Sequence, residues 1–182
     1  MKIRSITLVA MFAAVTAVCS QISIPIPFSQ VPFSMGIFAV LLTGALLPKY
    51  QALAAQLVYL LIGAVGIPVY AQFTGGLSIL AGPTGGYLVA YPIMAFFIAF
   101  VCEKFQTHIY PASLIATLVS LLICYLFGSG WLAIQSGTSF GAALLAGAAP
   151  FAVFDIIKGI LSCSLALVLR RALKKANLYE PV

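Results

Sequence analysis

The sequence predicts an all-α integral membrane protein, with six membrane-spanning helices forming one domain over residues 1–182. The first observation behind this prediction is composition: 63% of the residues are apolar, 7% are charged and the mean hydropathy is +1.17. A soluble domain carries about 25% charged residues, so most of this surface cannot face water. The second observation is a series of apolar runs, separated by proline, glycine or basic residues, that match the length of membrane spans.

The first span is expected to be a retained membrane helix. A cleaved signal peptide would need small residues before the cut, and Val18 before Cys19 does not provide them. The prolines at 25, 27 and 32 then break the helix, and later breaks fall at Pro48 and Pro68. The expected spans are residues 6–20, 34–47, 50–65, 84–102, 109–127 and 150–169.

Spans two and three are short for a bilayer that needs roughly 20 residues, and a re-entrant hairpin is the alternative. The positions of the basic residues decide between the two topologies. With the N-terminus in the cytoplasm and six spans, Lys49, Lys104 and the cluster at 170–175 all lie inside, and the outer loops carry no Lys or Arg. Four spans would place Lys49 outside. Six spans with both termini cytoplasmic therefore fit better.

Two long outer connections contain many glycines and no charges. The first covers residues 66–83, before the fourth span, and we expect it to lie at the level of a pocket open to the outside. The second runs from Gly128 towards Pro150 and is expected to be a loop, with a short helical piece near residues 142–148.

Asp155 and Lys158 are the only acid and base inside a long apolar run. Three residues apart, they share one helix face. They lie about 8 Å and 12 Å from Pro150 at roughly 1.5 Å per residue, in the outer half of the membrane. Charged groups at this depth usually face a cavity or one another. The sequence leaves three readings: a ligand site with an ammonium donor and a carboxylate acceptor, a neutralised pair that tethers helices, or a proton relay.

The stretch from Gly75 to Tyr87 precedes the fourth span at the same level. Pro83 suits a first helical turn, and the glycines leave N–H groups bare at a helix start, where anions bind. No Lys-Ser/Thr follows them, which excludes a nucleotide-binding loop. Tight packing of helices is the alternative explanation for the glycines.

Other chemistry is excluded by the scarcity of reactive groups. Three acids, one histidine and four isolated cysteines cannot assemble a catalytic triad or a metal site, so we expect no enzyme, no metal and no cofactor. The basic residues follow span ends, which argues against nucleic acid. Small residues repeat at four-residue spacing on the first span and allow close helix approach, either within the chain or on a partner: Ala10, Ala13, Ala14 and Ala17.

Together these motifs resemble the BioY family, the biotin-binding S components of energy-coupling factor (ECF) transporters. The resemblance covers nearly the whole chain. It is carried by four segments: Gly66-Ile-Pro-Val-Tyr70, Gly75-Gly76, Gly82-Pro-Thr-Gly-Gly-Tyr-Leu88 and Pro150-Phe with Asp155-Ile-Ile-Lys158. The combination of the last two is specific, whereas either alone is weak.

The resemblance implies an S-component fold in a prokaryotic cell membrane, with an outward-facing pocket for biotin as the transported ligand. It implies that the loop at 66–83 caps this pocket. It implies substrate contacts at Asp155, Lys158, Tyr87, Ser78, Gly82, Thr84, Gly85 and Tyr91, without fixing which end of biotin each meets. It also implies that the alanine faces dock on the transmembrane T component, and that two separate ATPase subunits supply energy.

The chain departs from the family pattern at two places that affect polar details of the pocket. A Pro-x-Thr-x-Gln stretch entering the second span reads Pro32-Phe-Ser-Met-Gly36 here, and Val89-Ala90-Tyr91 replaces the usual Gly-Phe after Leu88. Two other functions remain open: an S component for another small vitamin, and an autonomous ion-coupled carrier that uses Asp155. A purely architectural role for the charged pair is a third reading.

Overall fold

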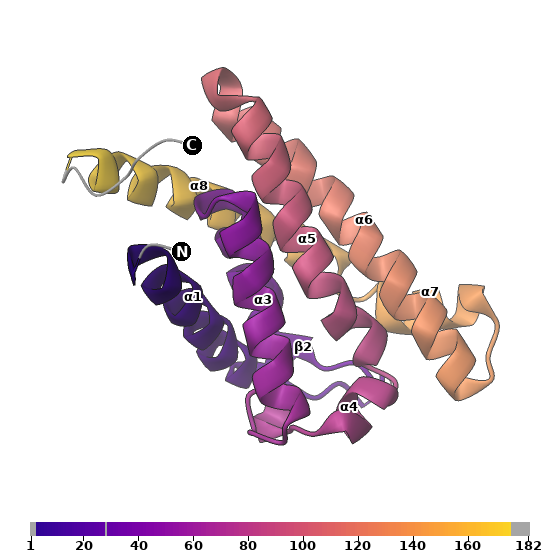
Figure 1. The fold of residues 1–182 in the computed structure, drawn as a ribbon. Helices are drawn as coiled ribbons and strands as arrows, with labels where there is room; N and C mark the ends of the chain where they lie inside the picture. The colour runs from indigo at the N-terminus through magenta and orange to yellow at the C-terminus, as the bar shows by residue number, and fades with distance from the viewer. Residues whose placement is uncertain (1–2, 28, 176–182) are drawn as a thin grey trace.

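The computed structural model describes residues 3–27 and 29–175, and helices make up most of it (Figure 1). The α-helices are α1 (Ile3–Gln21), α2 (Gly36–Leu46), α3 (Lys49–Ala64), α4 (Leu77–Ala81), α5 (Gly85–Lys104), α6 (Ile109–Ser136), α7 (Phe140–Gly147) and α8 (Ala152–Lys175). Two 3₁₀ turns, η1 (Ala71–Phe73) and η2 (Gln106–His108), lie in the connections. The strands β1 (Ser23–Ile24) and β2 (Phe33–Ser34) pair antiparallel between α1 and α2.

Four helical stretches among the described residues are long and apolar enough to cross a membrane: Ile3–Gln21, Gly85–Lys104, Gln106–Ser136 and Ala152–Lys175. The helices α2 and α3 lie where the second and third spans were predicted. With 11 and 16 residues they are shorter than the roughly 20 that a bilayer requires. Their crossing of the membrane therefore stays a prediction.

The expected loop after residue 127 is wrong in its first part, because α6 continues for nine more residues to Ser136. Gly128 lies inside the helix, and its role is to make room for a neighbouring side chain: a Cβ there would overlap the ring of Tyr87. The helix instead ends at Gly137, whose φ of +63° is left-handed and whose N–H bonds to the carbonyl of Ala133. Glycine count alone could not tell a packing glycine from a terminating one.

The helix α5 forms the centre of the bundle, where it packs against α2, α3 and α6. Met94, Ala95 and Ile98 on α5 are fully buried. Gly44 on α2 allows close approach, since a Cβ there would lie 2.8 Å from the carbonyl oxygen of Ala95. The helix α1 packs on α2 and α3, while α8 packs on α2 and α6. The core thus excludes water by helix packing, which leaves few places for polar groups.

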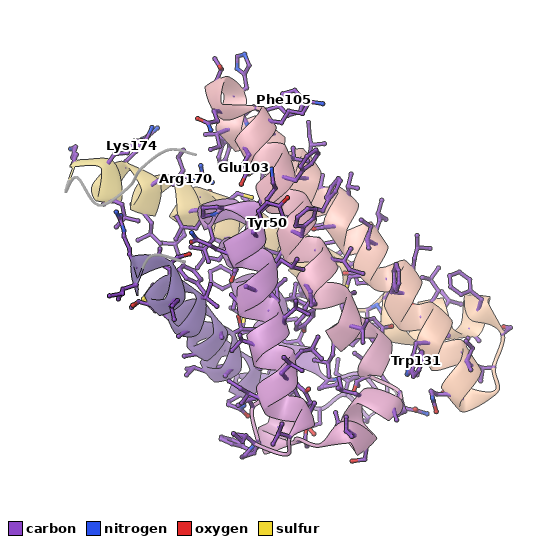
Figure 2. The ribbon with its side chains drawn as sticks, in the orientation of Figure 1. Tyr50, Glu103, Phe105, Trp131, Arg170 and Lys174 are labelled. Carbon is purple, nitrogen blue, oxygen red and sulfur yellow. The ribbon has the colours of Figure 1, made fainter. Side chains whose placement is uncertain are left out.

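Charged side chains gather at one end of the bundle. Figure 2 shows Glu103, Arg170 and Lys174 at the end where α5 finishes, with Trp131 towards the opposite end. Lys49 forms an ion pair with Glu103 at 2.9 Å, and this hydrogen bond raises the pKa of Lys49. In Figure 1 the first turn of α1 and the last turns of α8 lie on this same side.

Candidate functional site

Asp155 and Lys158 lie in the first two turns of α8 and contact each other directly. The ammonium Nζ donates to Oδ1 of Asp155 at 2.9 Å, and the side chains are only 2% and 6% exposed for the acid and the base. An isolated charge at mid-membrane costs roughly 2.5–3.5 kcal/mol on insertion scales, so pairing removes a large penalty. The structure therefore brings the two predicted charges together, inside the protein.

Other elements supply the remaining partners of this pair. The hydroxyl of Tyr125 on α6 donates to Oδ2 of Asp155 at 2.7 Å. Lys158 also donates to the carbonyl of Ser34 at 2.7 Å, and its Nζ lies 3.7 Å from the ring centroid of Phe33. Both carboxylate oxygens and the ammonium are thus engaged by the protein itself. A buried ion pair is tolerated when its remaining donors and acceptors are satisfied in this way.

The segment that contacts Lys158 is the β1–β2 hairpin between α1 and α2. Phe33 packs edge-on against Phe154, with ring centroids 5.4 Å apart, and stacks near Phe151 at 6.5 Å. The Ser34 hydroxyl accepts from the N–H of Gly36 at 3.0 Å, which fixes the start of α2. The proline-rich connection therefore folds over the first turns of α8 and covers the charged pair.

A row of tyrosines continues the polar interior towards α3. Tyr91 on α5 stacks on Tyr59 with ring centroids 6.3 Å apart, and the Tyr59 hydroxyl lies 3.0 Å from the hydroxyl of Ser20. Gly36 leaves room for these groups, since a Cβ there would lie 2.6 Å from the Ser20 hydroxyl, and the Tyr91 hydroxyl is 3.4 Å from the same position. Gly36 is two residues from Ser34, whose carbonyl accepts from Lys158, so Tyr91 is the predicted contact on α5 that lies near the charged pair.

Tyr87 is held on the α6 and α7 side of the same helix. Its hydroxyl donates to the carbonyl of Gly147 at 3.0 Å and lies 3.3 Å from the hydroxyl of Ser129. Ser129 is one turn of α6 beyond Tyr125, the residue that donates to Asp155. Its hydroxyl is already bonded to protein groups.

The remaining predicted contacts lie at the start of α5 and in α4. Ser78 is exposed on α4. The carbonyl of Gly82 accepts a hydrogen bond from Trp131 at 2.9 Å, and the carbonyl of Thr84 accepts from the N–H of Tyr87. Gly85 is buried, and a Cβ there would overlap the carbonyl of Leu80. In the described part of the chain, no hydrogen bond joins these four positions to Asp155 or Lys158.

The loop at 66–83 contacts the hairpin and the end of α1. The N–H of Phe73 donates to Oε1 of Gln21 at 2.9 Å, and the N–H of Gln72 donates to the hydroxyl of Ser23 at 3.1 Å. Tyr70 is buried against Tyr59, and this burial raises the pKa of Tyr70 to about 12. The expected cap is therefore joined to a second covering segment that sequence reasoning did not predict.

An apolar groove of about 520 Å³ lies between the start of α5 and α6. Its wall includes Gly85 and excludes Asp155, Lys158 and Tyr91. It is lined by Leu80, Gly85, Gly86, Val89, Leu126, Phe127, Gly130, Trp131 and Ile134. Without charged groups on its wall, this groove is distinct from the polar cluster.

The four alanines of α1 separate into two faces. Ala13 is buried and Ala17 packs against the core, on the side that carries Thr16 and Ser20. Ala10 and Ala14 are exposed. Only the second pair is therefore accessible to a partner in the membrane.

Sequence reasoning missed Tyr125, Phe33 and Ser34. Tyr125 carried a signal, because it is the one residue in the second half of the predicted fifth span with a phenol hydroxyl that needs a partner. Ser34 contributes a backbone carbonyl and Phe33 a ring face, and neither contact depends on a residue type that a motif would mark. The cluster offers carboxylate acceptors and an ammonium donor, which suits a ligand with N–H and carbonyl or carboxylate groups. Among the described residues, no group of three or more His, Cys, Asp or Glu is placed to hold a metal.

Comparisons with known proteins identify relatives over most of the chain. The family model described as the BioY family matches residues 1–175. A probable biotin transporter from Pyrococcus horikoshii is 39% identical and covers 87% of this chain and 91% of its own length. Biotin transporter BioY2 of Lactococcus lactis is 37% identical over 98% of this chain and 96% of its own. The crystal structure of the S-component for biotin from an ECF-type ABC transporter superposes with a TM-score of 0.88 at 26% identity, covering 93% and 92% of the two chains.

Proposed function

The chain belongs to the BioY family, and from this premise we propose that it binds biotin in a pocket reached from outside the cell. It is a biotin transporter S component by homology, a multi-pass protein of the plasma membrane and not an enzyme. Biotin is its transported ligand, and no cofactor is indicated. The expected family resemblance is therefore confirmed.

The observation that carries the proposal is the buried cluster of Asp155, Lys158 and Tyr125 beneath the β1–β2 hairpin. Asp155 can accept from the ureido N–H groups of biotin, and Lys158 can donate to its carbonyl or its carboxylate. Phe33 and Tyr91 add aromatic surface for the ring system, as ligand pockets usually require. Lys158 uses two of its three N–H donors on Asp155 and Ser34, so a ligand would take the third donor or displace the Ser34 carbonyl by a movement of the hairpin.

The other predicted contacts remain part of the proposal, and they differ in how directly each would meet the ligand. Tyr91, whose hydroxyl lies by Gly36, would face the ligand. Tyr87 would support the wall through its bonds to α6 and α7. Ser78, Gly82, Thr84 and Gly85 would reach the ligand only with movement of the 66–83 loop.

We propose one membrane domain of six spans for residues 1–182, with both termini in the cytoplasm. Residues 1–2, 28 and 176–182 lie outside the described part of the chain, so Lys2 supports this topology by sequence alone. Arg170 and Lys174 lie at the same end as Glu103 in Figure 2. Basic residues concentrated at one end are typical of the cytoplasmic side.

Energy for uptake would come from a T component and two ATPase subunits. The sequence has no Lys-Ser/Thr after its glycine-rich stretch and so offers no phosphate-binding loop of its own. Ala10 and Ala14 would form the docking face on α1, since both are exposed and small residues let membrane helices approach closely. Ala13 and Ala17 would stabilise α1 from within.

The biotin proposal is tested by purifying the chain without added ligand and identifying any retained small molecule by mass spectrometry. Calorimetry with biotin, and with thiamine and riboflavin as comparison ligands, then measures specificity. Retained biotin together with biotin-only binding supports the proposal. Binding of another vitamin in place of biotin would overturn it, and uptake by vesicles that lack ATPase subunits but collapse with a protonophore would indicate an autonomous carrier.

The docking proposal predicts that substitutions on the exposed face of α1 impair assembly with the T component and leave biotin binding unchanged. Ala10→Phe with Ala14→Phe should leave biotin affinity within about twofold of the parent and reduce copurification of the T component at least tenfold, because two rings would hold the helices apart. Met11→Phe on exposed α1 surface is the matched control. Equal assembly of all three proteins would show that this face does not dock.

A further inference from the structure

A fully buried glutamine joins α1, α2 and α3 away from the charged pair. Gln56 on α3 is 0% exposed. Its Nε2 donates to the hydroxyl oxygen of Thr16 at 3.1 Å and to that of Thr43 at 3.2 Å. Each threonine hydroxyl donates in turn to the carbonyl four residues earlier in its own helix. One amide therefore links three helices through both of its N–H groups.

The other half of this amide has no partner. Oε1 of Gln56 is buried and makes no hydrogen bond among the described residues. Reversing the amide would leave two N–H donors unpaired in place of one acceptor, so the observed orientation is the better of the two. A leucine at this position would avoid the unpaired oxygen, and both threonines would keep their own backbone bonds. Stability alone therefore does not explain why a glutamine is present.

A polar group at a helix interface can instead fix how the helices are aligned. Lipid is as apolar as leucine, so apolar helix faces in a membrane have little to oppose sliding or rotation. A single buried amide that requires two specific hydroxyls removes that freedom, as a buried asparagine sets register in coiled coils. Gln56 requires Thr16 and Thr43 at one level of the bundle.

The next side chain on this face of α3 is Tyr59. Tyr59 is three residues further along the same face of α3, and its hydroxyl bonds to Ser20, four residues beyond Thr16 on α1. The ring of Tyr59 stacks on Tyr91, whose hydroxyl lies by Gly36, two residues from the Ser34 carbonyl that accepts from Lys158. A small rotation of α3 at Gln56 would therefore move Tyr59 away from both contacts.

We propose that Gln56 is a positioning residue for the biotin site. By aligning α3 with α1 and α2, Gln56 holds Tyr59 against Tyr91. This inference rests on the proposed function. Gln56 itself touches no ligand and acts through Tyr59.

The test compares Gln56→Leu with Gln51→Leu. Gln51 lies on the same helix and also has a buried, unpartnered Oε1, which makes it a matched control. We expect Gln56→Leu to weaken biotin binding at least tenfold in calorimetry without lowering Tm, because it removes the alignment of the helices and leaves no polar group unpaired. Gln51→Leu should bind within twofold of the parent. A simple packing role for Gln56 would instead lower Tm and affinity together.

A second set of variants keeps Gln56 and changes its partners. Thr16→Val with Thr43→Val should reproduce the loss of affinity, while Thr16→Ser with Thr43→Ser keeps both hydroxyls and should restore affinity to within threefold of the parent. These variants decide the matter if Gln56→Leu does not fold. Unchanged affinity in the valine pair would overturn the proposal.

A measurement without ligand separates this inference from the biotin proposal. The protein labelled with 3-fluorotyrosine gives a ¹⁹F resonance for Tyr59 that Tyr59→Phe identifies. We expect one line in the parent and in Gln51→Leu, and several or broadened lines in Gln56→Leu. Absence of biotin binding in the parent would refute the proposed function alone, whereas an unchanged Tyr59 line in Gln56→Leu would refute the positioning role.

Discussion

Two ion pairs of equal length lie in opposite surroundings in the part of the chain that the structure describes. Lys158 and Asp155 are 2.9 Å apart, with side chains 6% and 2% exposed. Lys49 and Glu103 are also 2.9 Å apart, with side chains 28% and 16% exposed, at the end of the bundle where α5 finishes. The buried pair has three further partners in Tyr125, Ser34 and Phe33, whereas Glu103 additionally accepts the backbone N–H of Lys49.

The difference shows that distance does not determine the energetic importance of an ion pair. Water screens the Lys49–Glu103 pair, and exposed pairs of this kind contribute little to stability. The Asp155–Lys158 pair lacks water, so each charge depends on the other and on its hydrogen-bond partners. A ligand that enters can exchange with those partners, which makes the buried pair suited to binding and the exposed pair suited only to holding helix ends.

The largest expected effect comes from breaking the buried pair. Asp155→Ala should lower the free energy of unfolding by about 3–5 kcal/mol, because Lys158 would remain buried without its counter-ion. Biotin binding should be lost at the same time. Thermal unfolding in detergent and calorimetry measure the two effects.

A triple variant separates stability from binding at the same site. Asp155→Leu, Lys158→Met and Tyr125→Phe together leave no unpaired charge, so stability should return to within about 2 kcal/mol of the parent. Biotin should still not bind. Retained binding in this variant would assign the pair an architectural role alone.

The next effect concerns one bond of the cluster. Tyr125→Phe removes the donor to Oδ2 of Asp155 and should lower stability by about 1.5 kcal/mol, the upper range for such bonds between membrane helices. Tyr110→Phe is the control, since its hydroxyl contacts Ser164 away from the cluster. Equal losses in both variants would argue against a special role for the carboxylate bond.

A smaller effect is expected from the ring that covers Lys158. Phe33→Leu should lower stability by about 1 kcal/mol through loss of the cation–π contact and should speed biotin dissociation severalfold. Phe33→Trp keeps an aromatic face and should retain slow dissociation. Stopped-flow competition with unlabelled biotin measures both rates, and identical rates would exclude the hairpin as a cover.

The smallest effect belongs to the exposed pair. Glu103→Gln should leave biotin affinity unchanged and lower Tm slightly, with less loss at high salt. Because Glu103 raises the folded-state pKa of Lys49, the pair's contribution is complete below the unfolded pKa of lysine and disappears as pH rises through the raised value. The parent and the variant should therefore converge in Tm under strongly alkaline conditions.

Much of the helical organisation could be predicted from the sequence because it depends on local rules. Apolar runs indicated membrane helices, and prolines indicated their breaks. The meeting of Asp155 and Lys158 followed from their spacing on one helix face. The continuation of α6 past Gly128 could not be predicted, since it depends on the ring of Tyr87 from another helix.

The candidate site was predicted only where its residues are unusual in type. Charges in an apolar run stand out, so Asp155 and Lys158 were identified. The carbonyl of Ser34 and the ring of Phe33 belong to residues that occur anywhere, and long-range folding alone brings them to Lys158. The alanines of α1 show the same limit, because spacing grouped them and only packing separated Ala13 from Ala10.

By itself the sequence determined that this chain lies in a membrane, keeps one acid and one base within an apolar helix and belongs with the BioY proteins. These properties follow from composition and from residues near one another along the chain. Tertiary structure decided which uncharged groups contact that pair, which loop covers it and how Gln56 aligns three helices. Those contacts join residues up to 124 positions apart, such as Ser34 and Lys158, and packing rather than local periodicity selects them.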